Sequence, residues 1–205
     1  MKIRTILVPA LTGLFLGLVA PHAARAEVEE WKIEPNHSAA HFAVKHLLIS
    51  TVRGSFSHVT GTVWLDTEDI TKSRVEAEID ATTIDTGNEK RDRHLKSGDF
   101  FNVKKCPKIL FKSKKVEKDG DELKVVGDLT MNCVTKEVTL NVESISQTVV
   151  NPVGVPTRAI EATTKLNRQD FGISWNKSLD GGGVVVGDEV KVILDIQIIK
   201  PRAKK

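Results

Sequence analysis

Aromatic residues are scarce in this chain of 205 residues, which contains seven Phe, three Trp and no Tyr. Large rings fill a protein interior efficiently, whereas small residues such as Val, Ala and Gly leave more room. A completely filled interior is therefore not assured. The sequence also lacks a linker, a repeat or a low-complexity stretch that would divide it, which is typical of one domain.

Motifs of enzymes and metal sites are missing as well. Neither a G-x-S-x-G motif nor a carboxylate pair on an apolar strand face marks catalytic residues. Residues 181–183 are all Gly, but no helix with a Lys follows them, so they do not match a phosphate-binding loop. His37, His41 and His46 lie close in sequence without a Cys or carboxylate at the spacing of a known metal site. We therefore expect no catalytic residue, no metal and no cofactor.

The first 26 residues read as a cleaved signal peptide. Lys2 and Arg4 precede an apolar run at residues 6–20, and residues 24–26 form a small-x-small cleavage site. The apolar run is short for a membrane-spanning helix, which needs about 20 apolar residues. We expect cleavage after Ala26, export of the remaining chain, and no membrane span in the mature protein.

Removal of this segment changes the net charge. The whole chain has 30 Lys and Arg against 27 Asp and Glu, and Lys2, Arg4 and Arg25 belong to the signal peptide. The mature chain is then formally neutral, so its net charge indicates neither a nucleic acid partner nor an acidic membrane. Residues 200–205 read as a basic, solvated tail.

Alternation of apolar and polar residues dominates the mature chain. In residues 73–81, for example, Val75, Ala77 and Ile79 alternate with charged residues. The pattern predicts eight strands, with residues 31–33 as a candidate start of the first: 38–45, 52–66, 73–81, 109–117, 122–130, 136–147, 158–167 and 188–199. Eight strands with mostly short connections favour an all-β antiparallel sheet that closes into a barrel, which has just enough interior for side chains or one small ligand.

One densely charged stretch, residues 86–101, separates the third and fourth strands. Thr86 and Glu89 have the spacing of a capping box, and Gly98 is typical of a left-handed helix end. We expect a short helix of about three turns here. It has few apolar residues, so it must lie over another part of the structure rather than form a core.

A series of short motifs then suggests a family. Read in order, they are H-S at 37–38, F-x-V-K-H-L at 42–47, G-x-F at 54–56, T-G at 86–87, R-D-x-H-L-K-S-x-D-F at 91–100, P-x-I-x-F-x-S at 107–113, G-D-L-T at 127–130, V-T-K at 134–136 and R-x-D-F-G-I at 168–173. Together they cover nearly the whole mature chain, and in this order they resemble the YceI-like family. The resemblance implies a lipocalin-like extended eight-stranded antiparallel β-barrel over residues 27–199, with the short helix over one mouth. It also implies an apolar tunnel for polyisoprenoids or other long amphiphiles, and a periplasmic location.

Inward-facing residues of the strands and loops are the candidates for the tunnel wall. We expect the following side chains to line it: Phe42, Val44, Phe56, Val75, Ile79, Phe100, Phe111, Leu129, Phe171, Val192 and Leu194. The alternative is that the same residues fill a solid core.

The head group of such a ligand would meet polar residues at the barrel rim. His37 and His46 are candidates there, and Arg91 and His94 share the helix face that carries the anchoring Leu95. An arginine can hold a phosphate or quinone oxygen by a charge-assisted hydrogen bond. Alternatively, Arg91 pairs with a carboxylate such as Asp92 or Asp99 and only fixes the loop.

Two functions follow from this sequence. The first is a periplasmic carrier that holds a long-chain isoprenoid or similar lipid, without enzyme activity. The second is an unrecognised periplasmic hydrolase of an apolar ester or amide. A homodimer stays open in either case.

The only two cysteines, Cys106 and Cys133, flank the hairpin of the fourth and fifth strands. A disulfide is expected because disulfides persist in exported proteins, and two separate buried thiols are the alternative. Members of the resembled family usually carry Gly where this chain has Cys133, so Cys133 must reach a glycine-like backbone conformation with strain.

The register of that hairpin decides how the cysteines meet. A four-residue loop at 118–121 would place Glu117 opposite Glu122, and counting outward would bring the two cysteines opposite each other. The apolar faces match better if Phe111 lies with Leu129, which requires a shift of one residue or a bulge. Both registers keep the cysteines at the same end of the hairpin.

Overall fold

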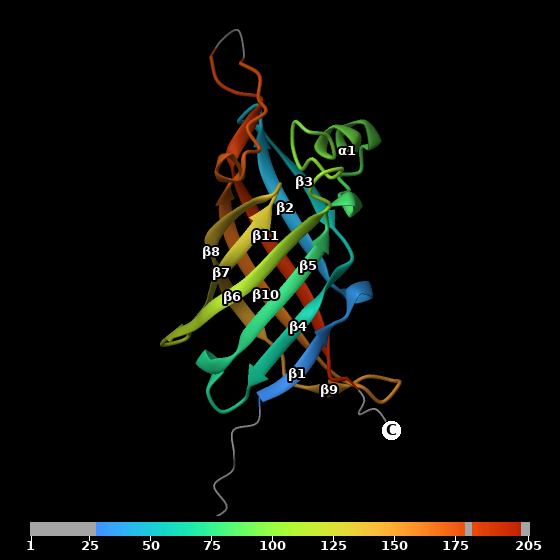
Figure 1. Cartoon of the computed structure of the whole chain (residues 1–205), viewed down its shortest axis with the longest axis vertical. Helices are drawn as coiled ribbons and strands as arrows, with labels where there is room; N and C mark the ends of the chain where they lie inside the picture. Colours follow the sequence, from blue (N-terminus) through green and yellow to red (C-terminus); the bar gives the residue numbers. More distant parts are fainter. Residues whose placement is uncertain (1–27, 179–181, 202–205) are drawn as a thin grey trace, which may run out of the picture.

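The computed structural model describes residues 28–178 and 182–201, so the predicted signal peptide and most of the predicted tail lie outside the described residues. One antiparallel sheet closes on itself and forms a barrel (Figure 1). Its strands are β1 (Val28–Ile33), β2 (Ala39–His46), β3 (Ser50–Phe56), β4 (Val59–Asp66), β5 (Arg74–Asp80), β6 (Lys108–Asp119), β7 (Glu122–Met131), β8 (Val134–Ile145), β9 (Val149–Val150), β10 (Pro156–Asn167) and β11 (Val186–Ile199). The helices are α1 (Glu89–Leu95) and the 3-10 turns η1 (Pro35–His37), η2 (Ile70–Lys72), η3 (Ala81–Thr83) and η4 (Arg168–Phe171).

The barrel wall consists of eight long strands, here called staves, two of which are interrupted and therefore comprise two strand segments each. Both β1 and β2 pair antiparallel with β11, so they form one stave that η1 interrupts. Pro35 starts that interruption, because proline has no backbone N–H to donate to a ladder. Likewise β4 pairs with β1 and β3 with β2, so β3 and β4 form a second interrupted stave. Pairing of β10 with β11 closes the barrel, which confirms the predicted eight-stranded architecture.

The two ends of the barrel differ. Around β1, in the lower half of the barrel in Figure 1, Trp31 is buried in a cluster with five aliphatic residues: Ile33, Val59, Val63, Leu65 and Ile198. At the upper end, α1 lies beside β3 (Figure 1). In residues 28–178 and 182–201, no helix has the length and apolar character needed to cross a membrane.

The predicted tail begins in an ordered position. The backbone N–H of Lys200 donates to the carbonyl of Pro156, and its ammonium donates to the Glu29 carboxylate at 2.7 Å. This hydrogen bond lowers the pKa of the Glu29 carboxyl below its ordinary value. Lys200 therefore packs against the barrel directly after the end of β11.

The helix α1 is shorter than the predicted three turns. Its N-cap is Asn88, whose side chain accepts a hydrogen bond from the backbone N–H of Arg91, so the predicted capping box from Thr86 is wrong. Asn is a strong N-cap residue, and its position directly before the helix decides the start. At the other end the cap residue Lys96 has right-handed helical geometry, and Gly98 does not adopt a positive φ.

The pairing of β6 with β7 shows the register of the hairpin that precedes Cys133. Asp119 pairs with Glu122 across a two-residue turn, so the predicted four-residue loop is wrong. A bulge between Ser113 and Lys115 then shifts the pairing by one residue. Phe111 consequently lies opposite Leu129, as the match of apolar faces required.

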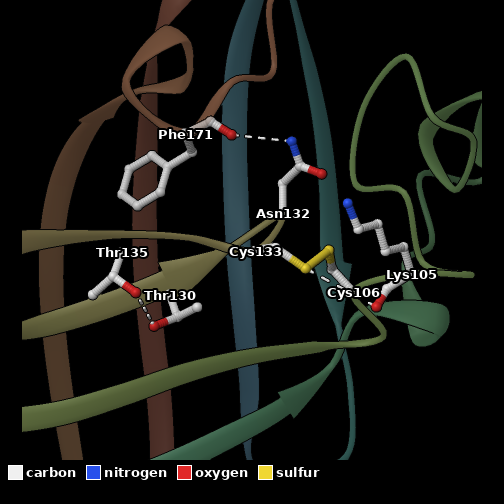
Figure 2. The surroundings of a disulfide bond; sticks show 7 residues. All are labelled: Lys105, Cys106, Thr130, Asn132, Cys133, Thr135 and Phe171. Carbon is white, nitrogen blue, oxygen red and sulfur yellow. Dashed lines mark hydrogen bonds between the residues drawn. A yellow bond between two sulfur atoms is a disulfide. The ribbon is translucent and has the colours of Figure 1, made fainter.

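The structure has a disulfide between Cys106 and Cys133, with a Cα–Cα distance of 5.6 Å (Figure 2). The two residues are not opposed in a strand pair as the simple register predicted. Cys133 lies in the two-residue turn between β7 and β8, where Asn132 and Cys133 have φ of 50° and 59°. Such a turn favours Asn-Gly, so Cys133 does occupy a position that suits glycine. The bond ties the segment after α1 to this turn.

Loss of the disulfide should destabilise the barrel. The bond closes a loop with a sequence separation of 27, for which chain entropy predicts about 3–4 kcal/mol of stabilisation. We expect the double substitution Cys106→Ser and Cys133→Ser to lower the free energy of unfolding by about 2–4 kcal/mol in urea titrations.

A matched variant separates the crosslink from the backbone conformation. Cys106→Ser with Cys133→Gly should lose about 1 kcal/mol less than the double serine variant, because glycine adopts a positive φ without strain. Equal losses in the two variants would contradict the account of the turn, and an unchanged stability in both would contradict the role of the disulfide.

Candidate functional site

Two adjoining cavities occupy the barrel interior. The lower cavity has a volume of about 210 Å³ and is lined mainly by aliphatic side chains from nearly every stave, such as Val75 on β5, Leu140 on β8 and Ile196 on β11. Arg74 also borders it, but its guanidinium stacks over the Trp64 ring at 3.6 Å. The wall of this cavity therefore offers an apolar ligand many contacts and few hydrogen-bonding groups.

The upper cavity has a volume of about 470 Å³ and lies among β2, β3, α1 and the segment before β11. Its lining includes the exposed side chains of Lys45 and Lys90, so it reaches the protein surface. Five residues line both cavities: Phe42, Phe56, Met131, Leu166 and Val192. The two cavities thus share part of their wall, and the mouth of the upper one lies at the α1 end.

The mouth carries positive charge. The residues that line the upper cavity include four Lys or Arg side chains and two imidazoles: Lys45, His46, Lys90, Arg91, His94 and Arg168. Among the described residues, no Asp or Glu lines this cavity. Oriented cationic groups around an apolar opening favour a ligand with an anionic or electron-rich end.

Most residues predicted for a tunnel wall lie at these cavities. The lower cavity is bordered by Phe42, Phe56, Val75, Ile79, Phe111, Leu129, Val192 and Leu194, and the upper one also by Val44 and Phe100. Phe171 lines neither cavity. It ends η4 and is fully buried in the core cluster that also contains Met131 and Ile173, so it supports the wall from behind.

Arg91 uses neither of the carboxylate partners considered from the sequence. Its guanidinium donates to the hydroxyl of Thr86 at 2.7 Å and to the carbonyl of Thr86 at 2.9 Å. The same hydroxyl donates to Asp92, so Asp92 is linked to Arg91 only through Thr86. Arg91 therefore has a fixed position at the cavity with no carboxylate directly on it in the part of the chain that the structure describes.

His94 has a different environment. Its Nε2 lies 2.8 Å from the Asp99 carboxylate, and its ring packs edge-on against Phe100 and Trp175 at centroid distances of 5.0 Å and 4.9 Å. A ligand would have to displace Asp99 to use that nitrogen. The hydroxyl of nearby Ser97 donates to the backbone carbonyl of His94 rather than to its ring, so these residues do not form a nucleophile and base.

The two other predicted rim histidines separate. His46 lines the upper cavity. His37 borders neither cavity, since it ends η1 on the barrel exterior and its Nδ1 lies 2.6 Å from the Glu34 carboxylate. His37 is thus a poor candidate for contact with a ligand in the tunnel. Within residues 28–178 and 182–201, no group of three or more His, Cys, Asp or Glu side chains could hold a metal ion.

Arg168 is the main organiser of the mouth. Only 4% of it is exposed, and its guanidinium donates to Asp188 and to the carbonyls of four residues: Ile173, Trp175, Val186 and Gly187. These carbonyls belong to the segment after η4 and to the start of β11. One buried side chain therefore joins two stretches that would otherwise have unsatisfied backbone acceptors.

Several residues at the mouth were not predicted from the sequence. Trp175 was not predicted, because it lies outside any strand and its position depends on the bonds from Arg168. Lys45 and Lys90 were not among the predicted site residues either. The motif that begins at Arg168 was a usable signal, since a charged residue directly after an apolar strand needs partners if it is buried.

Comparisons with known proteins bear on this site. The model of the YceI-like domain matches residues 31–198. The chain is 41% identical to the UPF0312 protein SA2479 of Staphylococcus aureus over 158 residues, which are 76% of this chain and 88% of the relative. It also resembles the YCEI protein of Campylobacter jejuni, with a TM-score of 0.64, 26% identity and coverage of 77% of this chain and 90% of that one.

Two further structures share the fold at lower identity. BcnA of Burkholderia cenocepacia superposes with a TM-score of 0.69 and 20% identity, covering 80% of this chain and 98% of that chain. A polyisoprenoid binding domain from Saccharophagus degradans superposes with a TM-score of 0.59 and 14% identity, covering 85% of this chain and 100% of that chain. At these identities the similarity is evidence for the barrel fold alone.

Substitution of Arg168 should destabilise the protein strongly. Arg168→Met would remove the donor from the carbonyls of Ile173, Trp175 and Gly187 and the cation from Asp188, while the Val186 carbonyl would keep its bond from Asn176, so we expect the free energy of unfolding to fall by about 3–5 kcal/mol. Arg53→Met changes an exposed arginine on β3 and should stay within about 0.5 kcal/mol of the parent. Similar values for the two variants in urea unfolding would contradict the organising role of Arg168.

Proposed function

Because the chain belongs to the YceI-like family, we propose that it is a carrier that holds a long-chain isoprenoid or similar amphiphilic lipid inside its barrel. The observation that carries this proposal is an apolar cavity inside the barrel that shares wall residues with a second cavity, whose mouth is cationic. A ligand that matches both parts has a long apolar chain and a polar or anionic end. The polyisoprenoid binding domain of similar fold from Saccharophagus degradans supports the same class of ligand.

Burial of the ligand's apolar chain in the lower cavity supplies enough free energy for binding. Each buried methylene contributes roughly 0.8 kcal/mol, so part of a prenyl chain can offset the cost of association and give micromolar affinity. An apolar cavity of this kind also offers water few hydrogen bonds, so a hydrocarbon gains contacts there without displacing well-bound water. Chain length should therefore affect affinity more than the chemistry of the head group.

The head group lies at Arg91 in this proposal. The Thr86 hydroxyl and carbonyl already orient the guanidinium, so little side-chain entropy is lost when a phosphate or quinone oxygen binds. His46, Lys45 and Lys90 add positive charge around the same opening. In the proposed role the protein works in the periplasm, which rests on the predicted signal peptide at residues 1–26.

A large side chain in the wall that the two cavities share should block the ligand's hydrocarbon chain. Val192 on β11 lines both cavities, and Val192→Trp would place a large ring between them. We expect the affinity for a long prenyl phosphate to fall at least about tenfold, with a smaller loss for short homologues.

The neighbouring residue on the same strand provides the control. Ile193 lies on the outer face with 44% exposure, and Ile193→Trp should leave affinity unchanged in fluorescence titrations. Unchanged affinity in the Val192→Trp variant, or affinity of the parent that does not rise with chain length, would contradict the tunnel.

Removal of the Arg91 side chain should weaken anionic ligands selectively. Arg91→Ala eliminates a charge-assisted hydrogen bond, so the affinity for a prenyl phosphate should fall about tenfold, while that for the matching prenyl alcohol changes little. Arg93→Ala is the control, since Arg93 pairs with Glu89 on the exposed face of α1. Equal effects on phosphate and alcohol would show that Arg91 only fixes the loop.

A further inference from the structure

The tip of the β2–β3 hairpin exposes large apolar side chains at the mouth of the upper cavity. Leu48 is 59% exposed and Ile49 is 82% exposed. The strand residues that lead into the tip, Lys45 and His46, line the upper cavity, and the N–H of Leu47 bonds to the carbonyl of Val185, another lining residue. The apolar tip is therefore continuous with the rim of the mouth.

The backbone of this tip makes its composition unusual. Leu47 and Leu48 have φ of 53° and 60°, and the N–H of Ile49 bonds to the carbonyl of His46. Two successive positive φ values are typical of a type I′ turn, which favours Asn-Gly. Leucine there costs conformational energy and exposes apolar surface to water. Folding alone thus explains neither the residue type nor its exposure.

Basic side chains accompany the tip. Lys45 and Lys90 are exposed at the mouth, and neither forms an ion pair with a carboxylate among residues 28–178 and 182–201. The carboxylates nearby are engaged, since Asp99 meets His94 and Asp188 meets Arg168. In the described part of the chain, Lys45 and Lys90 are thus cationic groups at the mouth without a carboxylate partner.

We propose that this end docks on an anionic lipid bilayer, with Leu48 and Ile49 inserted among the acyl chains and Lys45 and Lys90 over the lipid phosphates. Apolar side chains flanked by lysines are the combination that binds the interface of such membranes. Docking in this orientation turns the mouth toward the membrane, so a lipid passes between bilayer and barrel without crossing water. The transfer of a lipid between bilayer and barrel rests on the proposed function, whereas docking on the bilayer does not.

Vesicle flotation tests the surface with the processed chain from residue 27, which contains the whole barrel. The parent should bind vesicles of phosphatidylcholine mixed with phosphatidylglycerol and should bind pure phosphatidylcholine vesicles much more weakly. Leu48→Gly with Ile49→Ser should weaken binding to the mixed vesicles at least about tenfold. The melting temperature should not fall, because glycine relieves the positive φ at position 48.

The other end of the barrel offers a matched control (Figure 1). Val149 and Val150 on β9 are 59% and 68% exposed, so Val149→Ser with Val150→Ser removes similar apolar surface far from the mouth. This variant should bind vesicles like the parent. Equal loss in both variants, parent-like binding by the tip variant, or no binding by the parent would overturn the proposal.

Two further measurements distinguish membrane docking from ligand binding and from dimerisation. The affinity of the tip variant for a prenyl phosphate in detergent-free solution should equal that of the parent, because Leu48 and Ile49 line neither cavity. A failure of prenyl phosphate binding in both proteins would instead count against the proposed function. If sedimentation shows that the tip variant turns a parent dimer into a monomer, and the parent does not bind vesicles, then the tip is an interface between copies and not a membrane surface.

Discussion

An apolar space that its own side chains cannot fill is the constraint on which this barrel depends. Eight staves enclose an interior whose walls are mostly Val, Leu, Ile and Ala, and the chain has few rings to place there. Protein interiors are normally packed at crystal-like density, so unfilled apolar volume forgoes dispersion contacts. A hydrocarbon chain restores those contacts, and the fold thereby favours a lipid over a polar ligand.

The two ends of the barrel differ in the residues that surround this apolar space. At the lower end, Trp31 packs in a cluster of aliphatic residues, with the ion pair of Glu29 and Lys200 beside it. At the upper end, hydrogen bonds to the backbone and one covalent crosslink fix the segments around the mouth. Arg168 fixes the segment before β11, and the disulfide ties the region after α1 to the β7–β8 turn. A ligand that enters through the upper cavity passes the cationic side chains of Lys45, Lys90 and Arg91.

Alternation was sufficient to predict the staves, because each strand turns one face inward and a period of two is readable in residues such as 73–81. Alternation could not predict the start of α1 or the hairpin register, because these depend on local hydrogen bonds and on a bulge. Asn88 rather than Thr86 caps α1, and the bulge after Ser113 moves the hairpin register by one residue. The wall of the tunnel could mostly be predicted from strand parity, whereas Trp175 could not, since its place depends on a hydrogen bond from Arg168.

The most direct test of an apolar chain inside the barrel is methyl NMR of the protein titrated with a prenyl phosphate. The account predicts that the methyl resonances of Val192 and Leu194, which line the cavities, shift and saturate together, while those of Ile193 on the outer face of the same strand do not move. Shifts confined to outward methyl groups at saturation would contradict it, because the ligand would then bind outside the barrel.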